Sequence, residues 1–318
     1  MRKTISTLCL VLIALAACAP ATGSTTEATA TTETGLVEII EQATQTIEQP
    51  GTGTAEPTME ETPLAVEWQS MPVVPEDLSP AMREVYQRGL ERGRDPERFS
   101  KFGDCQNVPS LFLAMFDTGE YRLGDSYAYL QETIDHFSGS WSRESSAVLG
   151  GMNVASVQTL YFTDPQHCEV TESPMVCEIR VHNPSLVLIS FETWFGKPAS
   201  MAEDSKGSYE ARLRAVVDYV LSQDVVPILG TKADNLEGDH SINAAIARVA
   251  RDYQIPLWNY WAATDVLPSH GLSEDGFHLT FAQNYFDDPA RMEMAWPWRN
   301  LTALQTIDAV YRALNDLP

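Results

Sequence analysis

Four short apolar runs, separated by helical patterns, constrain the fold of this chain more than any other feature. They are Phe99–Gly103, Ser185–Phe191, Val225–Gly230 and Ile255–Tyr260. Stretches with helical spacing, such as SYEARLRAVVDYVLSQ and HSINAAIARVARDY, follow the second and third runs. Continuous apolar strands that alternate with amphipathic helices indicate a parallel sheet covered on both faces. We therefore expect an α/β fold, a three-layer α/β/α sandwich with a mostly parallel central sheet. A further strand is expected near 146–149, and LTALQTIDAVYRAL predicts a last helix.

The amino-terminal segment MRKTISTLCLVLIALAAC predicts a secretion signal over residues 1–18. Arg2 and Lys3 precede an apolar run that is too short to span a bilayer as a helix. Its end, Leu15–Cys18, resembles a bacterial lipobox, in which the cysteine is lipidated and becomes the mature N-terminus; a plain cleavage site is the alternative. Acyl chains on Cys18 would anchor the protein to a membrane without spanning it. We expect an extracytoplasmic protein that is lipid-anchored to a bacterial membrane, or secreted if Cys18 is not lipidated.

The next segment, residues 19–79, is rich in Thr, Ala, Glu and Pro, and no Lys or Arg occurs between Lys3 and Arg83. Such a composition cannot bury enough apolar surface to offset the entropy of ordering the chain, so a disordered acidic linker is expected. The net charge of −23 argues against nucleic acid as a partner. Residues 80–318 are enough for one domain with a large core.

The five cysteines divide by position. Cys9 leaves with the signal, and Cys18 is the lipidation candidate. Cys168 and Cys177 bracket a polar loop and predict a disulfide, which would stabilise the fold by roughly 2–3 kcal/mol. A metal site there is the alternative, but neither a second cysteine pair nor a histidine cluster lies nearby in the sequence to complete four ligands. Cys105 is left over as a candidate reactive thiol.

Polar groups follow the predicted strands, where open α/β sheets bind their ligands. Gly103, Asp104 and Cys105 end the first run, and a glycine pair with Asn153 follows the predicted strand at 146–149. The remaining groups are Glu192, Lys232 and the late sequence Asp275-Gly276-Phe277-His278. We expect Lys232 to line a pocket. The residues indicate no metal or organic cofactor.

The order of these elements resembles the SGNH hydrolases, also called GDSL esterases and lipases, from about Phe99 to the end. That resemblance implies a flavodoxin-like sandwich, a nucleophile in a Gly-Asp-Ser turn, and a late Asp-x-x-His motif. Cys105 stands at the place of the serine, and Asp275 and His278 match the late motif. His278 would then take the nucleophile's proton, and Asp275 would orient the imidazole. Gly151 is the best match to the family's oxyanion glycine.

Two positions depart from the family pattern. A cysteine is a competent nucleophile for acyl transfer, but the neighbouring carboxylate of Asp104 disfavours the thiolate of Cys105. The family's Gly-x-Asn-Asp block appears as Ser-Phe-Glu-Thr, so Glu192 replaces an amide donor. A carboxylate donates no hydrogen bond unless it is protonated. Either burial keeps Glu192 neutral, or Asn153 is the donor instead, or the oxyanion hole is defective.

A literal Gly-Asp-Ser occurs at Gly124-Asp125-Ser126, after the short polar run GEYRL. Asp125 or Ser126 there is better interpreted as the N-cap of a helix that runs through Ile134.

The leading hypothesis from the sequence is an SGNH-like hydrolase that cleaves an ester with a Cys105–His278–Asp275 triad. Its partners would be a small-molecule or glycan ester and a membrane, reached through the lipid anchor. The alternative is a catalytically inactive protein of the same fold that binds a ligand or glycan. Hydrolysis that depends on Cys105 separates the two hypotheses.

Overall fold

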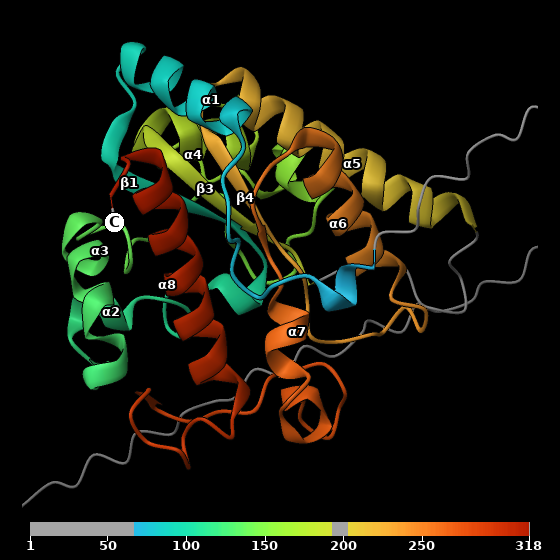
Figure 1. The fold of residues 1–318 in the computed structure, drawn as a ribbon. Helices are drawn as coiled ribbons and strands as arrows, with labels where there is room; N and C mark the ends of the chain where they lie inside the picture. Colours follow the sequence, from blue (N-terminus) through green and yellow to red (C-terminus); the bar gives the residue numbers. More distant parts are fainter. Residues whose placement is uncertain (1–66, 193–202, 318) are drawn as a thin grey trace, which may run out of the picture. The chain divides into compact units, whose positions relative to one another are not determined.

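A computed structural model describes residues 67–192 and 203–317; Cys18 and the signal segment lie outside these ranges. Among the described residues, four parallel strands form the central sheet in the order β1-β3-β4-β5 (Figure 1). Their bounds are β1 (Asp95–Gly103), β3 (Pro184–Ser190), β4 (Val226–Gly230) and β5 (Leu257–Trp258). The four runs predicted as strands are confirmed, with shifted ends.

The expected strand at 146–149 is reduced to a single parallel bridge between Val148 and Gly103. The N–H of Gly103 donates to the carbonyl of Ala147 over 3.0 Å, and a glycine pair follows at once. The strands of the central sheet can be renumbered 1 to 5 in chain order, with this bridge as strand 2 in place of the separate β2. Their spatial order is then 2-1-3-4-5, which is the flavodoxin-like order. The strand order reverses between β1 and β3. The α/β fold predicted from the sequence is therefore confirmed.

Helices cover both sides of the sheet. The α-helices are α1 (Pro80–Glu91), α2 (Met115–Thr118), α3 (Gln131–His136), α4 (Pro174–His182), α5 (Glu203–Ser222), α6 (Ser241–Tyr253), α7 (Tyr260–Thr264) and α8 (Ala295–Leu314). The 3-10 helices are η1 (Trp68–Ser70), η2 (Cys105–Asn107), η3 (Asp125–Leu130), η4 (Ser156–Gln158), η5 (Leu160–Phe162) and η7 (Pro268–Gly271). Helices α4, α5 and α6 lie on one side of the sheet, and α3 and α8 lie on the other (Figure 1). A separate parallel pair joins β2 (Tyr121–Arg122) to β6 (Asn284–Tyr285).

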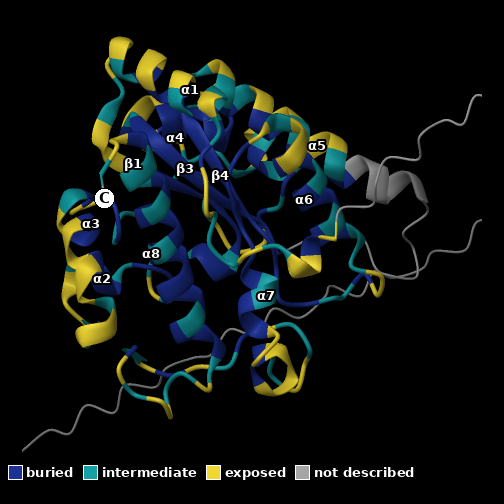
Figure 2. Ribbon diagram, in the orientation of Figure 1, coloured by how far each residue is buried: buried dark blue, intermediate teal, exposed yellow. Residues whose placement is uncertain are grey.

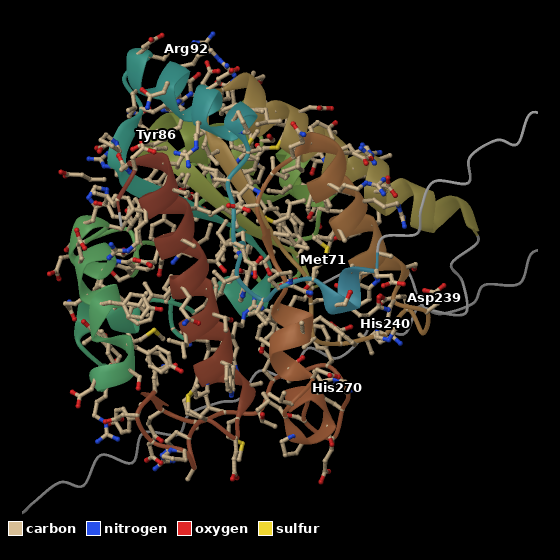
Figure 3. The ribbon with its side chains drawn as sticks, in the orientation of Figure 1. Met71, Tyr86, Arg92, Asp239, His240 and His270 are labelled. Carbon is tan, nitrogen blue, oxygen red and sulfur yellow. A yellow bond between two sulfur atoms is a disulfide. The ribbon has the colours of Figure 1, made fainter. Side chains whose placement is uncertain are left out.

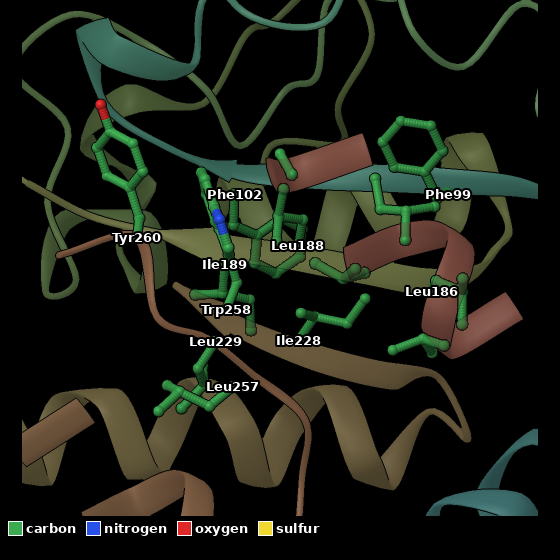
Figure 4. Packing of buried hydrophobic residues seen from close by; sticks show 14 of the residues in the cluster. Phe99, Phe102, Leu186, Leu188, Ile189, Ile228, Leu229, Leu257, Trp258 and Tyr260 are labelled. Atoms are coloured by element: carbon green, nitrogen blue, oxygen red, sulfur yellow. The ribbon is translucent and has the colours of Figure 1, made fainter. Parts of the chain in front are cut away.

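The core lies between the sheet and these helices. Every residue of β3 is buried, as expected for a central parallel strand that is covered on both faces (Figure 2). Phe102 of β1, Leu188 of β3, Trp258 of β5 and Tyr260 of α7 belong to one buried apolar cluster (Figure 4). None of the helices in the described ranges is long and apolar enough to cross a lipid bilayer.

The folded body begins before residue 80, which corrects the boundary expected from composition. Trp68 is buried, and its carbonyl accepts a hydrogen bond from Asn259 Nδ2 over 2.8 Å. The same amide donates to the carbonyl of Met71. In Figure 3, Met71 lies on the side of α7, whereas Arg92, next to α1, lies at the opposite end. Residues 68–71 therefore pack on the end of the sheet that carries the site.

Candidate active site

The turn after β1 places Cys105 at the point where the strand order reverses. Asp104 is buried; its Oδ1 accepts from the N–H of Gln106 (3.0 Å), and its Oδ2 accepts from the N–H of Glu192 (2.6 Å). Asp104 therefore ties the turn after β1 to the turn after β3. Cys105 opens η2 and is partly exposed. Ligands of open α/β sheets bind at this kind of reversal.

Gly103 is required at this turn because another side chain occupies the space beside it. Asn107 Nδ2 donates to the carbonyl of Ser190 over 2.7 Å, next to the glycine. A Cβ at Gly103 would lie 2.1 Å from that nitrogen, which is well inside a van der Waals contact. A glycine is therefore needed at this position of the Gly-Asp-Cys turn, because the hydrogen bond from Asn107 to β3 leaves no room for a Cβ.

The glycine segment predicted for the oxyanion lies against Cys105. A Cβ built at Gly150 would be 3.9 Å from the Cβ of Cys105, and Gly151 has a φ of +82°. Asn153 Oδ1 accepts from the N–H groups of Ala155 and Ser156, so its carbonyl group holds the turn that leads into η4. The Nδ2 group of Asn153 makes no hydrogen bond with a described residue and is available as a donor.

Glu192 lies inside the protein rather than facing a pocket. Its carboxyl group forms an ion pair with Arg299 of α8, and the two side chains are 1% and 0% exposed. Arg299 Nη2 also donates to Ser190 Oγ over 3.1 Å, and its guanidinium lies 4.7 Å from the ring centre of Phe112. Burial raises the pKa of Glu192 to about 8, although Arg299 acts against the shift. Because the carboxyl group of Glu192 contacts Arg299 inside the protein, it supplies no donor to the cysteine turn, which leaves Asn153 or a defective oxyanion hole among the three alternatives from the sequence.

Lys232, also expected to line a pocket, is buried as well. Its Nζ donates to Asp234 Oδ1 over 2.5 Å and to Glu237 Oε2 over 2.7 Å. Asn243 braces its backbone on both sides, because Oδ1 accepts from the N–H of Lys232 and Nδ2 donates to its carbonyl. Lys232 therefore stabilises the loop after β4 from within, where it is 1% exposed.

The late Asp-x-x-His turn holds a hydrogen-bonded pair. His278 Nδ1 lies 2.5 Å from Asp275 Oδ2, and Asp275 Oδ1 accepts from the N–H groups of Phe277 and His278. These bonds, the one from the His278 ring first, lower the pKa of Asp275 to about 2. Because an ionised carboxylate only accepts, Nδ1 carries the proton and Nε2 is left as an acceptor. The His278 side chain is 62% exposed. Among the described residues, the ring's hydrogen bonds end on Asp275 and do not reach Cys105.

Helix α8 connects the histidine loop to the cysteine turn. Thr280, two residues after His278, accepts at Oγ1 from the N–H of Ala295, the first residue of α8 (2.9 Å). Arg299, one turn further along α8, holds Glu192, whose N–H in turn holds the turn after β1. The sequence alone does not single out Arg299 as this partner. Its position in an apolar helix pattern was the available signal, since a buried guanidinium needs a carboxylate or carbonyl partner.

A cavity of about 680 Å³ lies between the loop after Cys105 and the loop after His278. Its lining includes Pro109, Ser110 and Leu111 on one side and Phe281, Gln283 and Asn284 on the other. The cavity is thus formed by residues that follow each predicted catalytic segment, and neither Cys105 nor His278 lines it.

The disulfide between Cys168 and Cys177 is confirmed, with a Cα–Cα distance of 5.3 Å. Gly124 rather than Asp125 or Ser126 is the residue before η3, and Ser126 is exposed. Within residues 67–192 and 203–317, no group of three or more His, Cys, Asp or Glu side chains is arranged to hold a metal ion.

Comparison with known proteins finds a distant structural likeness. A scan against protein-family models finds no match, and a search of curated proteins finds none either. Among solved structures, the chain is similar to a GDSL-like lipase from Bacteroides thetaiotaomicron VPI-5482, at 12% identity and a TM-score of 0.37. That likeness covers 72% of this chain and 98% of the lipase. It is too weak to assign a function, so the proposals below rest on the residues themselves.

Proposed function

We propose that the protein is an SGNH-like hydrolase that cleaves an ester through Cys105. The observation that carries this proposal is the placement of Cys105, which is partly exposed after β1 and lies beside Gly150 where the strand order reverses. The hydrogen-bonded Asp275–His278 pair supports it, since that pairing leaves Nε2 able to take a proton.

In the proposed reaction, Cys105 Sγ attacks the ester carbonyl carbon and gives its proton to His278 Nε2. Asp275 keeps the imidazole oriented and stabilises the imidazolium. The C–O bond to the alcohol then breaks, the alcohol takes the proton from His278, and water hydrolyses the thioester by the same route. The proposed oxyanion donors are the backbone N–H groups of Cys105 and Gly151, with Asn153 Nδ2. Catalytic hydrogen bonds are often long without substrate and tighten when it binds.

The test is hydrolysis of 4-nitrophenyl acetate by the mature protein. We expect Cys105→Ala and His278→Ala to lower kcat/KM by at least about 100-fold. Ser126→Ala is the matched control, because Ser126 belongs to the literal Gly-Asp-Ser and should leave the rate unchanged. Activity that survives Cys105→Ala would exclude Cys105 as the nucleophile.

The second candidate is a non-catalytic protein that binds a ligand or glycan in the same cleft. The buried ion pair of Glu192 favours it, because this pair leaves no side-chain donor at the family's third block. The rate of Cys105 alkylation at pH 7 separates the two. Slow labelling that is equal in the wild type and in His278→Ala would support the binding protein.

We further propose that Cys18 carries the lipid that anchors the protein to a bacterial membrane on its extracytoplasmic side. An ester-linked acyl group on a glycan is the substrate class that the family resemblance suggests. Partition of the full-length protein into a detergent phase, lost on Cys18→Ala, tests the anchor.

A further inference from the structure

A second Asp-x-x-His turn lies outside the proposed triad, at Asp164-Pro165-Gln166-His167. His167 Nδ1 is 2.7 Å from Asp164 Oδ2, and Asp164 Oδ1 accepts from the N–H of Gln166 over 2.8 Å. This is the same pattern as in the Asp275–His278 turn. The hydrogen bond from His167 lowers the pKa of Asp164, so the carboxylate is ionised and Nδ1 carries the proton. His167 Nε2 is therefore an acceptor, and the side chain is 64% exposed.

This second pair borders a cavity of about 780 Å³, within the size range of small-molecule sites. Val108 and Pro109, shortly after Cys105, form one wall. Val148 and Leu149 form another, directly before the glycine that lies against Cys105. The cavity is thus adjacent to the proposed nucleophile.

The cavity is mainly apolar and holds no uncompensated cation. Phe162 and Val181 complete the apolar lining. Arg143 also lines the cavity, but its guanidinium is paired with the buried carboxylate of Glu178. Glu144 adds a further exposed negative charge. An anionic ligand is disfavoured by this balance, whereas a neutral ligand with apolar surface fits it.

The loop that carries His167 is fixed firmly to α4. The next residue, Cys168, is disulfide-bonded to Cys177 of α4. Arg180, also in α4, binds both carboxylate oxygens of Glu172 at 2.5 and 2.7 Å. Arg180 Nη2 donates to the carbonyl of His167 as well. An acceptor held in place by a covalent bond and an ion pair is preorganised for a ligand.

We propose that this cavity binds the apolar, hydroxyl-bearing part of a neutral amphiphile, with a ligand O–H donating to His167 Nε2. The apolar part packs against Leu149 and Phe162. The assignment of this ligand as part of the ester substrate rests on the proposed function, whereas the binding site itself does not.

The test is an NMR titration of the full chain carrying Cys105→Ala with octyl glucoside. The octyl glucoside is kept below its critical micelle concentration. We expect saturable binding that is weakened about tenfold by His167→Phe, the equivalent of one hydrogen bond. Phe162→Ala should weaken it as well. His270→Phe is the matched control, since His270 is an exposed histidine outside this cavity, and it should leave binding unchanged.

The inference would be overturned if octyl glucoside showed no saturable binding. It would also be overturned if the protein bound octyl glucoside with the same affinity with His167 and with His167→Phe. The binding assay involves no turnover, so the two proposals fail separately. Binding without ester hydrolysis would reject only the hydrolase. Hydrolysis of a monoacylglycerol with a KM unaffected by His167→Phe would reject only the role of His167.

Discussion

Two buried lysines in different parts of the fold should respond to removal in opposite ways. Lys101 of β1 is 1% exposed, and its Nζ donates to the carbonyl of Trp141 over 2.7 Å. Among the described residues, no carboxylate forms an ion pair with it. Lys232 is equally buried but binds the carboxylates of Asp234 and Glu237. Lys101→Met should therefore stabilise the protein at pH 7, and Lys232→Met should destabilise it.

The gain in the free energy of unfolding expected for Lys101→Met follows from the pKa of Lys101, which burial lowers from 10.5 to about 7. Between these values the unfolded chain holds a proton that the folded protein has released, so the free energy of unfolding rises with pH. The slope is about 1.4 kcal/mol per pH unit, or about 3 kcal/mol between pH 7 and pH 9. After subtraction of the lost hydrogen bond, Lys101→Met should be about 3 kcal/mol more stable than the wild type at pH 7. This advantage should disappear as the pH approaches 10.

Lys232→Met is the matched control, because it leaves two buried carboxylates without a counter-charge. Its cost should be about 3–5 kcal/mol at pH 7. Urea denaturation of the wild type and both variants at pH 7, 8 and 9 measures the free energy of unfolding of each protein and its pH dependence. If Lys101→Met is less stable than the wild type at pH 7, or its difference from the wild type does not change with pH, then Lys101 is not buried as a neutral amine.

Two further predictions concern the disulfide and the turn glycine. The bond between Cys168 and Cys177 closes a loop with a sequence separation of 9, so Cys168→Ala/Cys177→Ala should cost about 2.6 kcal/mol and lower Tm by about 5–10 °C. An unchanged Tm in calorimetry would contradict this. Gly103→Ala should displace Asn107, cost about 2 kcal/mol, and lower kcat for ester hydrolysis more than it changes KM. Equal stability in urea would show that the turn accommodates a Cβ.

The strands and long helices were predictable because their signals are local. β3 is a continuous apolar run that is buried along its whole length, and α6 repeats its apolar residues at helical spacing. The strand at 146–149 was overestimated, since the glycines that follow it leave room for a single bridge to Gly103. The start of the body was placed too late, because the composition of residues 68–79 gives no sign that Asn259 binds their backbone.

The site was predictable only in part. The Asp275–His278 pair follows from a three-residue spacing within one turn. The pairing of Glu192 with Arg299 joins residues 107 positions apart, and no periodicity reports such a contact. The second pair at Asp164 and His167 has the same spacing as the first, so its signal was present. No predicted strand leads into this pair, so its position in the sequence does not point to a ligand site.

The disulfide makes one wall of the cavity beside His167 dependent on the redox conditions in which the chain folds. The bond between Cys168 and Cys177 holds the loop with His167 against α4, and such bonds persist only in oxidising surroundings. A copy that remained among cellular reductants would carry this loop without its covalent brace. The cavity beside His167 would then lack one fixed wall. The proposed binding is thus linked to oxidation of the two cysteines, and the reduced polypeptide would be a poorer binder than the same polypeptide after oxidation.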